Sequence, residues 1–111
     1  VPRDAAICRG EAFAPVVVMD TYRDFDDALD AVNDSPFGLQ AGVFTADPTK
    51  MRRAFEVLEV GAVLVNQAPA FRTENMPYGG VKDSGCGREG VRYAMQEMTE
   101  PRLLVVNERE G

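Results

Sequence analysis

The chain has 111 residues, of which 45% are hydrophobic, 27% charged and 8% aromatic, a composition typical of one globular domain or less. Its formal net charge of −6 argues against nucleic acid or acidic lipid as the main partner. The sequence has no histidine, which excludes a histidine-based triad or metal site, and its two cysteines do not have the spacing of a metal site.

The first third of the chain is predicted to alternate strand and helix. Residues 16–19 form a β-branched run of strand length after Pro15. Asp24 can cap a helix whose apolar residues recur at helical spacing: Phe25, Ala28, Leu29 and Val32. The turn at 33–38 ends this helix, and residues 41–44 are predicted to form a second short strand.

The next helix has the clearest sequence signals. Asp47 is a good capping residue, Pro48 suits the first helical position, and one face is apolar: Met51, Ala54, Phe55 and Leu58. Gly61 stands where a helix C-cap is expected. Residues 62–65 follow as a third strand without polar alternation, which favours a strand buried on both faces of a parallel sheet.

Residues 66–87 are dominated by glycine, proline and polar residues, and a loop of this length in a compact domain is usually functional. A further helix follows over residues 91–98 and a last strand over residues 103–106. The predicted fold class is therefore α/β: a parallel β-α-β-α-β unit, then a long loop, a helix and a C-terminal strand. Three parallel strands leave two open edges, so we expect this unit to dock against more protein.

Residues 85–90 match the dinucleotide pattern GxGxxG, and Glu108 lies near the distance of a ribose-binding acid. The true fingerprint needs a strand directly before its first glycine, so that the following helix points at the pyrophosphate. Residues 81–84 do not have a strand pattern. We favour a glycine-rich turn that leads into a capped helix, with a small nucleotide-binding unit as the alternative.

A longer block, residues 77–89, has the sequence P-Y-G-G-V-K-D-S-G-C-G-R-E. It resembles the aldehyde dehydrogenase signature P-(F/Y)-G-G-x-K-x-S-G-x-G-R-E at every constrained position. Residues 10–16, 33–44 and 61–66 resemble further segments of that family, in the same order and at the same spacing. The chain is identified as similar to the C-terminal part of the NAD(P)-dependent aldehyde dehydrogenases. Within that family, residues 75–78 and 98–102 are most similar to the lactaldehyde, phosphonoacetaldehyde and non-phosphorylating glyceraldehyde-3-phosphate dehydrogenase branch.

The resemblance implies roles for three residues, and position on the variable loop suggests two more. Glu11 matches an acid that hydrogen-bonds the nicotinamide-side ribose, since a carboxylate can accept from both hydroxyls, and Phe13 matches an aromatic near the nicotinamide. Tyr78 matches an aromatic near the aldehyde tunnel, and Phe71 and Arg72 are candidate tunnel residues on the preceding loop. Arg72 would add positive charge for a small, anionic aldehyde. Each role has an alternative. Glu11 and Arg72 could instead be solvent-exposed charges, and for Arg72 this is the more expected case. Tyr78 and Phe71 could simply pack under the loop.

No catalytic residue and no metal ligand are expected in this chain. The reactive cysteine, the general-base glutamate and the oxyanion-binding asparagine of the family belong to other segments. Cys8 and Cys86 fill variable positions and are expected to be inert thiols. Four charged or polar residues of the signature are expected to hold the loop and helix together: Lys82, Ser84, Arg88 and Glu89.

The implied reaction is oxidation of an aldehyde to a carboxylic acid through a cysteine thiohemiacetal and thioester, with NAD or NADP as hydride acceptor. Residues 1–100 would belong to the catalytic domain, and residues 101–111 would form an oligomerisation strand and tail. The expected partners are a small aldehyde, the remainder of the dehydrogenase chain, and further copies in a homodimer or homotetramer.

This fragment alone is expected to be inactive. Neither nucleic acid nor membrane is expected as a partner, because the chain is acidic and no apolar run approaches membrane-spanning length. No signal peptide is visible, so a cytoplasmic setting is expected. The alternative function is a non-catalytic binding or assembly module derived from the same fold, which the missing nucleophile favours.

Overall fold

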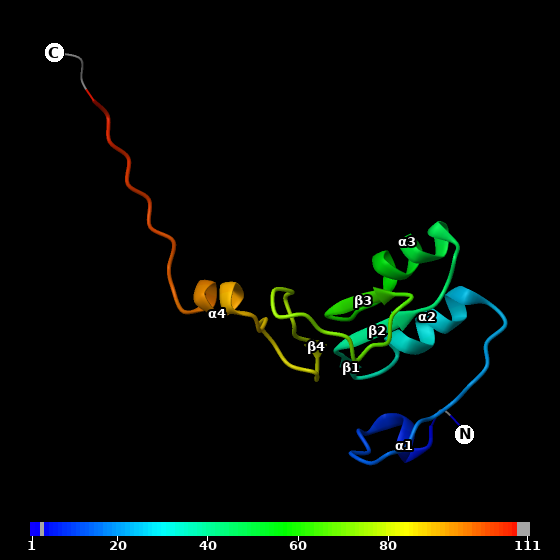
Figure 1. Ribbon diagram of the computed structural model, residues 1–111. Coiled ribbons are helices and arrows are strands. Elements are labelled where there is room, and N and C mark those ends of the chain that lie inside the picture. Colours follow the sequence, from blue (N-terminus) through cyan, green and yellow to red (C-terminus); the bar gives the residue numbers. More distant parts are fainter. Residues whose placement is uncertain (3, 109–111) are drawn as a thin grey trace.

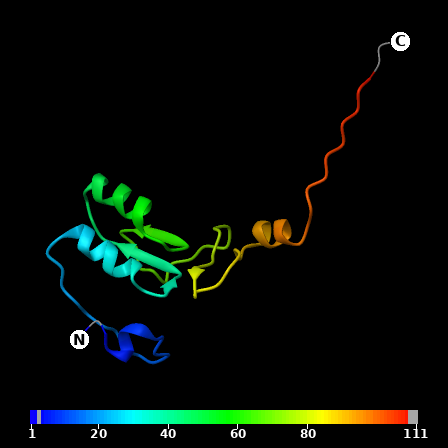
Figure 2. The ribbon, with the colours of Figure 1, turned by 180° about the vertical axis from the view of Figure 1, so that it is seen from behind.

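The structure is a computed structural model that describes residues 1–2 and 4–108 (Figure 1). Its helices and strands, in chain order, are α1 (Ala6–Arg9), α2 (Phe25–Asn33), β1 (Phe37–Gly38), β2 (Gln40–Val43), α3 (Pro48–Val57), β3 (Ala62–Val65), β4 (Val81–Lys82) and α4 (Val91–Glu97). Figure 2 shows the same arrangement from behind, with α1 at one side of the central body and the segment after α4 projecting from the other.

The two longer helices begin where the sequence predicts. The Asp24 carboxylate accepts hydrogen bonds from the backbone N–H groups of Asp26 and Asp27 at 2.8 and 3.4 Å, which caps α2. The Asp47 carboxylate accepts from Thr49 N at 2.8 Å, and Pro48 occupies the first turn of α3. Both predicted N-caps are confirmed.

The central sheet is a parallel pair. Strand β2 pairs with β3 in the register Gln40↔Ala62 to Val43↔Val65, and α3 is the crossover between them. The predicted strands at 41–44 and 62–65 are confirmed, the first displaced by one residue. A second, antiparallel pair joins β1 to β4, so a two-residue strand forms inside the region predicted to be a loop.

The core lies where α2 and α3 pack together against the β2–β3 pair (Figure 1). Three apolar residues are buried there among the described residues: Leu29, Ala54 and Leu58. The side chains of Phe25, Ala41, Val43, Val57, Val60 and Val63 pack around them and are partly buried. At the rim, an ion pair of 2.9 Å joins Asp26 to Arg53, and this carboxylate raises the pKa of the Arg53 guanidinium.

Two predicted strands are not formed. Residues 16–19 and 103–106 lie outside any helix or strand, and their side chains are open to solvent, with Val17 80% and Leu103 85% exposed. Both segments have the apolar composition of a strand, but a strand also needs a neighbouring edge for its backbone hydrogen bonds. The predicted parallel β-α-β-α-β unit is therefore reduced to one β-α-β unit. The end of the predicted tail, residues 109–111, lies outside the described residues.

The prediction that Gly61 caps α3 is also wrong. The helix ends at Val57 with Leu58 as its C-cap. Gly61 has a different reason to lack a side chain, because a Cβ there would overlap the carbonyl oxygen of Gly79 and lie 2.9 Å from that of Leu39. The glycine thus marks the place where the signature segment crosses the start of β3.

The chain as a whole is elongated. Its radius of gyration is 19.7 Å and its extents are 77 × 33 × 23 Å. A compact domain of this length has a radius of gyration of about 13 Å. The difference arises because α1 and the segment after α4 extend away from the small core (Figure 1).

Candidate functional site

The loop that carries the candidate tunnel residues is fixed tightly where it leaves the sheet. Asn66, at a φ of 55°, donates a hydrogen bond from Nδ2 to Thr45 O at 3.0 Å. Its Oδ1 accepts from Thr45 N at 2.8 Å. The loop then passes close to β2, since a Cβ on Gly42 would lie 2.7 Å from Gln67 O. The first turn of the loop is therefore held against the carboxyl end of β2.

The other end of the loop is held by Lys82. Its ammonium group donates to Asn33 O at 2.7 Å and to Ser35 O at 3.3 Å, and it pairs with Glu59 Oε2 at 3.0 Å. A cation at the carboxyl end of α2 is favourable because free backbone carbonyls point there. This one side chain joins β4 to the ends of α2 and α3, which agrees with a structural role for Lys82.

Two further signature residues bind backbone atoms. Ser84 Oγ accepts from Gly38 N at 3.0 Å, which ties the turn after β4 to β1. Arg88 Nη1 donates to Gly80 O at 2.9 Å and to Gly87 O at 2.7 Å. Both contacts agree with the structural interpretation, and together they give the segment from Gly79 to Glu89 a fixed path.

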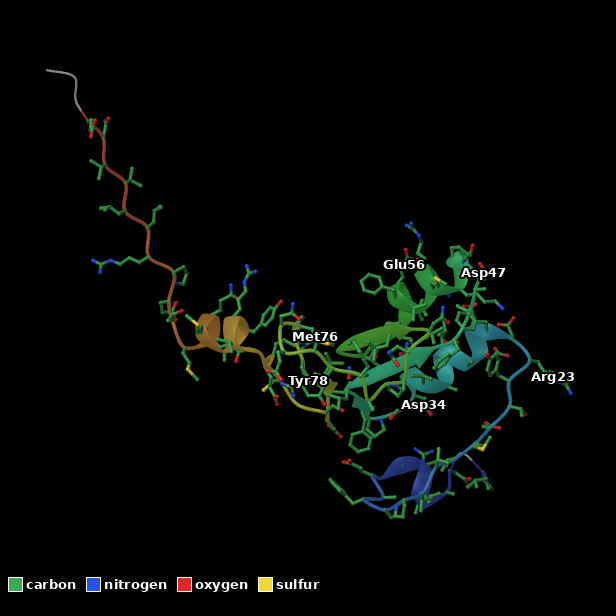
Figure 3. All side chains as sticks on the ribbon, in the orientation of Figure 1. Arg23, Asp34, Asp47, Glu56, Met76 and Tyr78 are labelled. Atoms are coloured by element: carbon green, nitrogen blue, oxygen red, sulfur yellow. The ribbon has the colours of Figure 1, made fainter. Side chains whose placement is uncertain are left out.

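Arg72, Tyr78 and Glu89 form one cluster. The guanidinium carbon of Arg72 lies 4.3 Å from the centre of the Tyr78 ring, and Arg72 Nη1 lies 3.1 Å from Glu89 Oε2. Tyr78 is labelled in Figure 3, where it lies between the central body and α4. The structure thus brings together two of the three predicted tunnel residues and adds Glu89. This pairing has no signal in the sequence, because Glu89 is far from Arg72 along the chain and matches a motif position that is expected to be structural.

Phe71, the third predicted tunnel residue, precedes Arg72 on the same loop. Its side chain is exposed, and its carbonyl accepts a hydrogen bond from Gln40 Nε2 at 3.1 Å. That bond holds the middle of the loop to the start of β2. Phe71 is therefore placed on the same loop as the cluster, with an open side chain.

The predicted cofactor residues lie elsewhere. Glu11 and Phe13 follow α1 in a segment without helix or strand, apart from the central body (Figure 1). The Phe13 ring is 92% exposed and its φ is 26°. Among the residues that the structure describes, the exposed Glu11 carboxylate has no hydrogen-bond or ion-pair partner. The chain by itself does not bring these two residues to the tunnel loop.

The GxGxxG stretch at 85–90 forms a turn, and a carboxylate of this chain accepts a hydrogen bond from one of its backbone amides. Arg88 N donates to Glu97 Oε1 at 3.1 Å, so this amide is directed at a carboxylate of α4. Helix α4 begins after Gly90, which has a φ of 115° and provides no side-chain cap. Glu108 is exposed in the C-terminal segment, beyond the end of α4. This geometry agrees with the turn interpretation, although the predicted cap is absent.

The remaining features do not add a site. Cys86 is an exposed free thiol in the glycine-rich turn, and Cys8 is a partly exposed free thiol in α1. Two open hollows, one between Cys8 and α2 and one between Asn75 and α4, are not lined by the cluster residues. In the described part of the chain, no group of three potential metal-ligating side chains is found, and no helix is long and apolar enough to span a membrane.

Sequence comparison gives a consistent match. A model of the "Aldehyde dehydrogenase family" matches residues 1–104. The 3-sulfolactaldehyde dehydrogenase of Priestia megaterium is 49% identical over 104 residues, which are 94% of this chain and 22% of that protein. The lactaldehyde dehydrogenase of Methanococcus aeolicus is 44% identical over 107 residues, 96% of this chain and 23% of that protein. The chain thus spans about a fifth of the length of the curated relatives it matches.

Solved structures match as well. Aldehyde dehydrogenase 21 from Physcomitrella patens, in complex with the reaction product succinate, matches with a TM-score of 0.87 at 49% identity, over 90% of this chain and 21% of that one. The glyceraldehyde-3-phosphate dehydrogenase GapN of Methanocaldococcus jannaschii, complexed with NADP, matches with a TM-score of 0.80 at 45% identity, over 88% of this chain and 21% of that one. The lactaldehyde dehydrogenase and the GapN enzyme belong to the branch that residues 75–78 and 98–102 of this chain indicate.

Proposed function

Because this chain belongs to the aldehyde dehydrogenase family, we propose that it forms the C-terminal portion of an NAD(P)-dependent enzyme that oxidises an aldehyde to a carboxylic acid. The observation that carries the proposal is the family match over residues 1–104, which includes the complete signature block at 77–89. In this proposal the nucleophilic cysteine belongs to another part of the full-length enzyme. The isolated 111-residue chain would then be inactive.

The cofactor role falls to Glu11 and Phe13. The exposed Glu11 carboxylate has the chemistry to accept hydrogen bonds from two ribose hydroxyls. The exposed Phe13 ring offers an apolar surface for the nicotinamide end. These residues fit NAD or NADP, which when bound would accept hydride from the aldehyde carbon. Their task is to bind and orient the cofactor.

The aldehyde tunnel would be formed in part by the loop at 67–80. Tyr78, Phe71 and Arg72 are its proposed lining residues, and the anchors at Asn66 and Lys82 would keep it in one conformation. A small anionic aldehyde suits the cation at Arg72. The relatives named for 3-sulfolactaldehyde and solved with succinate support this, since both compounds carry an acidic group.

The two exposed apolar segments are proposed to be covered in the full-length enzyme. Residues 1–100 would complete the catalytic domain, with 16–19 as a strand of its sheet. Residues 101–111 would form an oligomerisation strand and tail in a homodimer or homotetramer. Exposed side chains such as Val17 and Leu103 support this, because apolar segments of this kind mark contact surfaces. Two free cysteines fit a cytoplasmic setting.

Calorimetry of NAD and NADP binding tests the cofactor role. In the full-length enzyme, Glu11→Ala should raise the Kd of the preferred cofactor about 10- to 100-fold, the loss expected for hydrogen bonds to a charged group. Glu11→Gln should fall between wild type and Glu11→Ala, because its amide oxygen still accepts. Glu56→Ala, an exposed acid on α3, is the control and should leave the Kd unchanged. An unaltered Kd in Glu11→Ala would remove Glu11 from the cofactor site.

A further inference from the structure

The strongest unassigned feature is the pairing of Glu89 with Arg72. The two side chains meet through Glu89 Oε2 and Arg72 Nη1 at 3.1 Å, and the guanidinium lies over the Tyr78 ring at 4.3 Å. Among the described residues, Arg72 Nη2 and Nε have no acceptor. One edge of the guanidinium is therefore held by the protein, while the other N–H groups are available to a ligand.

The backbone fixes the geometry of this cluster. Tyr78 N donates to Glu89 O at 3.1 Å and Glu89 N donates to Tyr78 O at 2.6 Å, which forms an isolated antiparallel bridge. Side chains that lie directly opposite each other in such a bridge project to the same side. Glu89 and Tyr78 consequently stand next to each other, and Arg72 contacts both.

The ion pair contributes little to folding. The Arg72 side chain is 43% exposed and that of Glu89 is 68% exposed, and ion pairs this accessible are weak sources of stability. Their effect is on orientation, because an ion pair on one side and an aromatic face on the other restrict a long, flexible side chain. The loss of Glu89 should therefore change recognition more than it changes stability.

We propose that Glu89 is a positioning residue that holds Arg72 over Tyr78, so that the free N–H groups of Arg72 bind the acidic group of an anionic aldehyde. This inference rests on the proposed function, in which the loop at 67–80 lines the aldehyde tunnel. The ligand class is a short aldehyde with a carboxylate, sulfonate or phosphate at its far end. Bidentate binding to such groups needs an oriented guanidinium, which a freely rotating arginine does not provide.

The test compares kcat and KM of the full-length enzyme for succinic semialdehyde and for butanal, a matched pair that differs in the carboxylate. Arg72→Ala should raise the KM for succinic semialdehyde about 10-fold or more and leave the KM for butanal within about two-fold. Glu89→Ala should raise the KM for succinic semialdehyde several-fold, with kcat for both aldehydes unchanged. Glu89→Gln keeps an oxygen acceptor and should restore the wild-type KM.

The double variant Arg72→Ala with Glu89→Ala should be no worse than Arg72→Ala alone, because Glu89 acts only through Arg72. Arg53→Ala is the control for losing an exposed ion pair, since Arg53 of α3 pairs with Asp26 of α2 and contacts none of the three cluster residues. It should leave both KM values unchanged.

A fall in kcat for both aldehydes in Glu89→Ala, or an effect of Glu89→Ala that persists in full without Arg72, would overturn the inference. A KM for succinic semialdehyde that is the same in Arg72→Ala as in wild type would also overturn it. These outcomes leave the proposed function intact. A wild-type enzyme that forms no NAD(P)H with any aldehyde would instead contradict the proposed function itself.

Discussion

At Gly61, two segments of backbone come so close that no side chain fits between them. A Cβ at this position would overlap the carbonyl oxygen of Gly79 and would lie 2.9 Å from Leu39 O. Both neighbours are backbone atoms, so neither can rotate away as a side chain could. The crossing sets where the signature segment leaves the sheet, and with it the position of Tyr78 beside Arg72.

Substitution of Gly61 by alanine should therefore displace the signature segment. We expect Gly61→Ala to destabilise the full-length enzyme by at least about 2 kcal/mol, because the new methyl group overpacks against fixed backbone. Amide hydrogen exchange should show the loss at residues 78–82. Gly10→Ala is the matched control, since its Cβ would lie 3.7 Å from Ala6 O, and its effect should stay within about 0.5 kcal/mol. Equal exchange in the two variants would show that the crossing is not tight.

Tyr78, Glu89 and Gly61 show which features of single residues can be predicted from the sequence. The motif at 77–89 identified Tyr78 as a site candidate, and the structure places it in contact with Arg72. The partnership with Glu89 was missed because it depends on a turn that brings distant positions together. The C-cap predicted at Gly61 is wrong, because a glycine that lets two backbone segments pass close together cannot be distinguished in the sequence from a glycine that caps a helix.

Among the elements, α2 and α3 are joined by Asn33. Its Nδ2 donates to Val57 O at 2.8 Å, and its Oδ1 accepts from Glu59 N at 2.9 Å. The last residue of one helix thus satisfies free backbone groups at the end of the other. Lys82 then binds the carbonyl of Asn33, so the ends of both helices and β4 are connected through one residue.

Removing this amide should loosen the end of α3. Asn33→Ala should lower the local opening free energy of the Glu59 amide by about 1 kcal/mol, because the exposed Glu59 N–H loses its acceptor and the part-buried Val57 carbonyl loses its donor. Asn33→Asp should be at least as disruptive, since it places a carboxylate against the Val57 carbonyl. Asn75→Ala, which removes an exposed contact with Thr73, is the control and should leave this amide protected. Native-state hydrogen exchange measures the difference; protection equal to wild type in Asn33→Ala would disprove the role.

Elements with local signals were predictable, and those that need a distant partner were not. Asp24 and Asp47 cap their helices through hydrogen bonds within the first turn, so a short stretch of sequence contains the whole cause. The strand predicted at 16–19 requires a neighbouring edge that the described chain does not supply. The pairing of β1 with β4 was missed because each strand has two residues, too few to show a period.

At the scale of the whole molecule, the chain has a small core and large open apolar segments. Only three apolar side chains are buried among the described residues, and the radius of gyration of 19.7 Å exceeds the value of about 13 Å for a compact domain of this length. The exposed residues lie mainly before α2 and after α4, on either side of a well-defined β-α-β unit. This distribution fits a segment whose apolar surfaces are completed by additional protein.

The most direct test of the account exchanges segments between relatives. Residues 1–104 would replace the matching 104-residue segment of the Priestia megaterium 3-sulfolactaldehyde dehydrogenase, which is 49% identical. The measurement is aldehyde-dependent NAD(P)H formation by this exchange enzyme, by the same enzyme without the segment, and by the isolated chain. We predict that the exchange enzyme is active and that the other two proteins are not. A soluble exchange enzyme that binds NAD(P) but forms no NAD(P)H, or turnover by the isolated chain, would contradict the account.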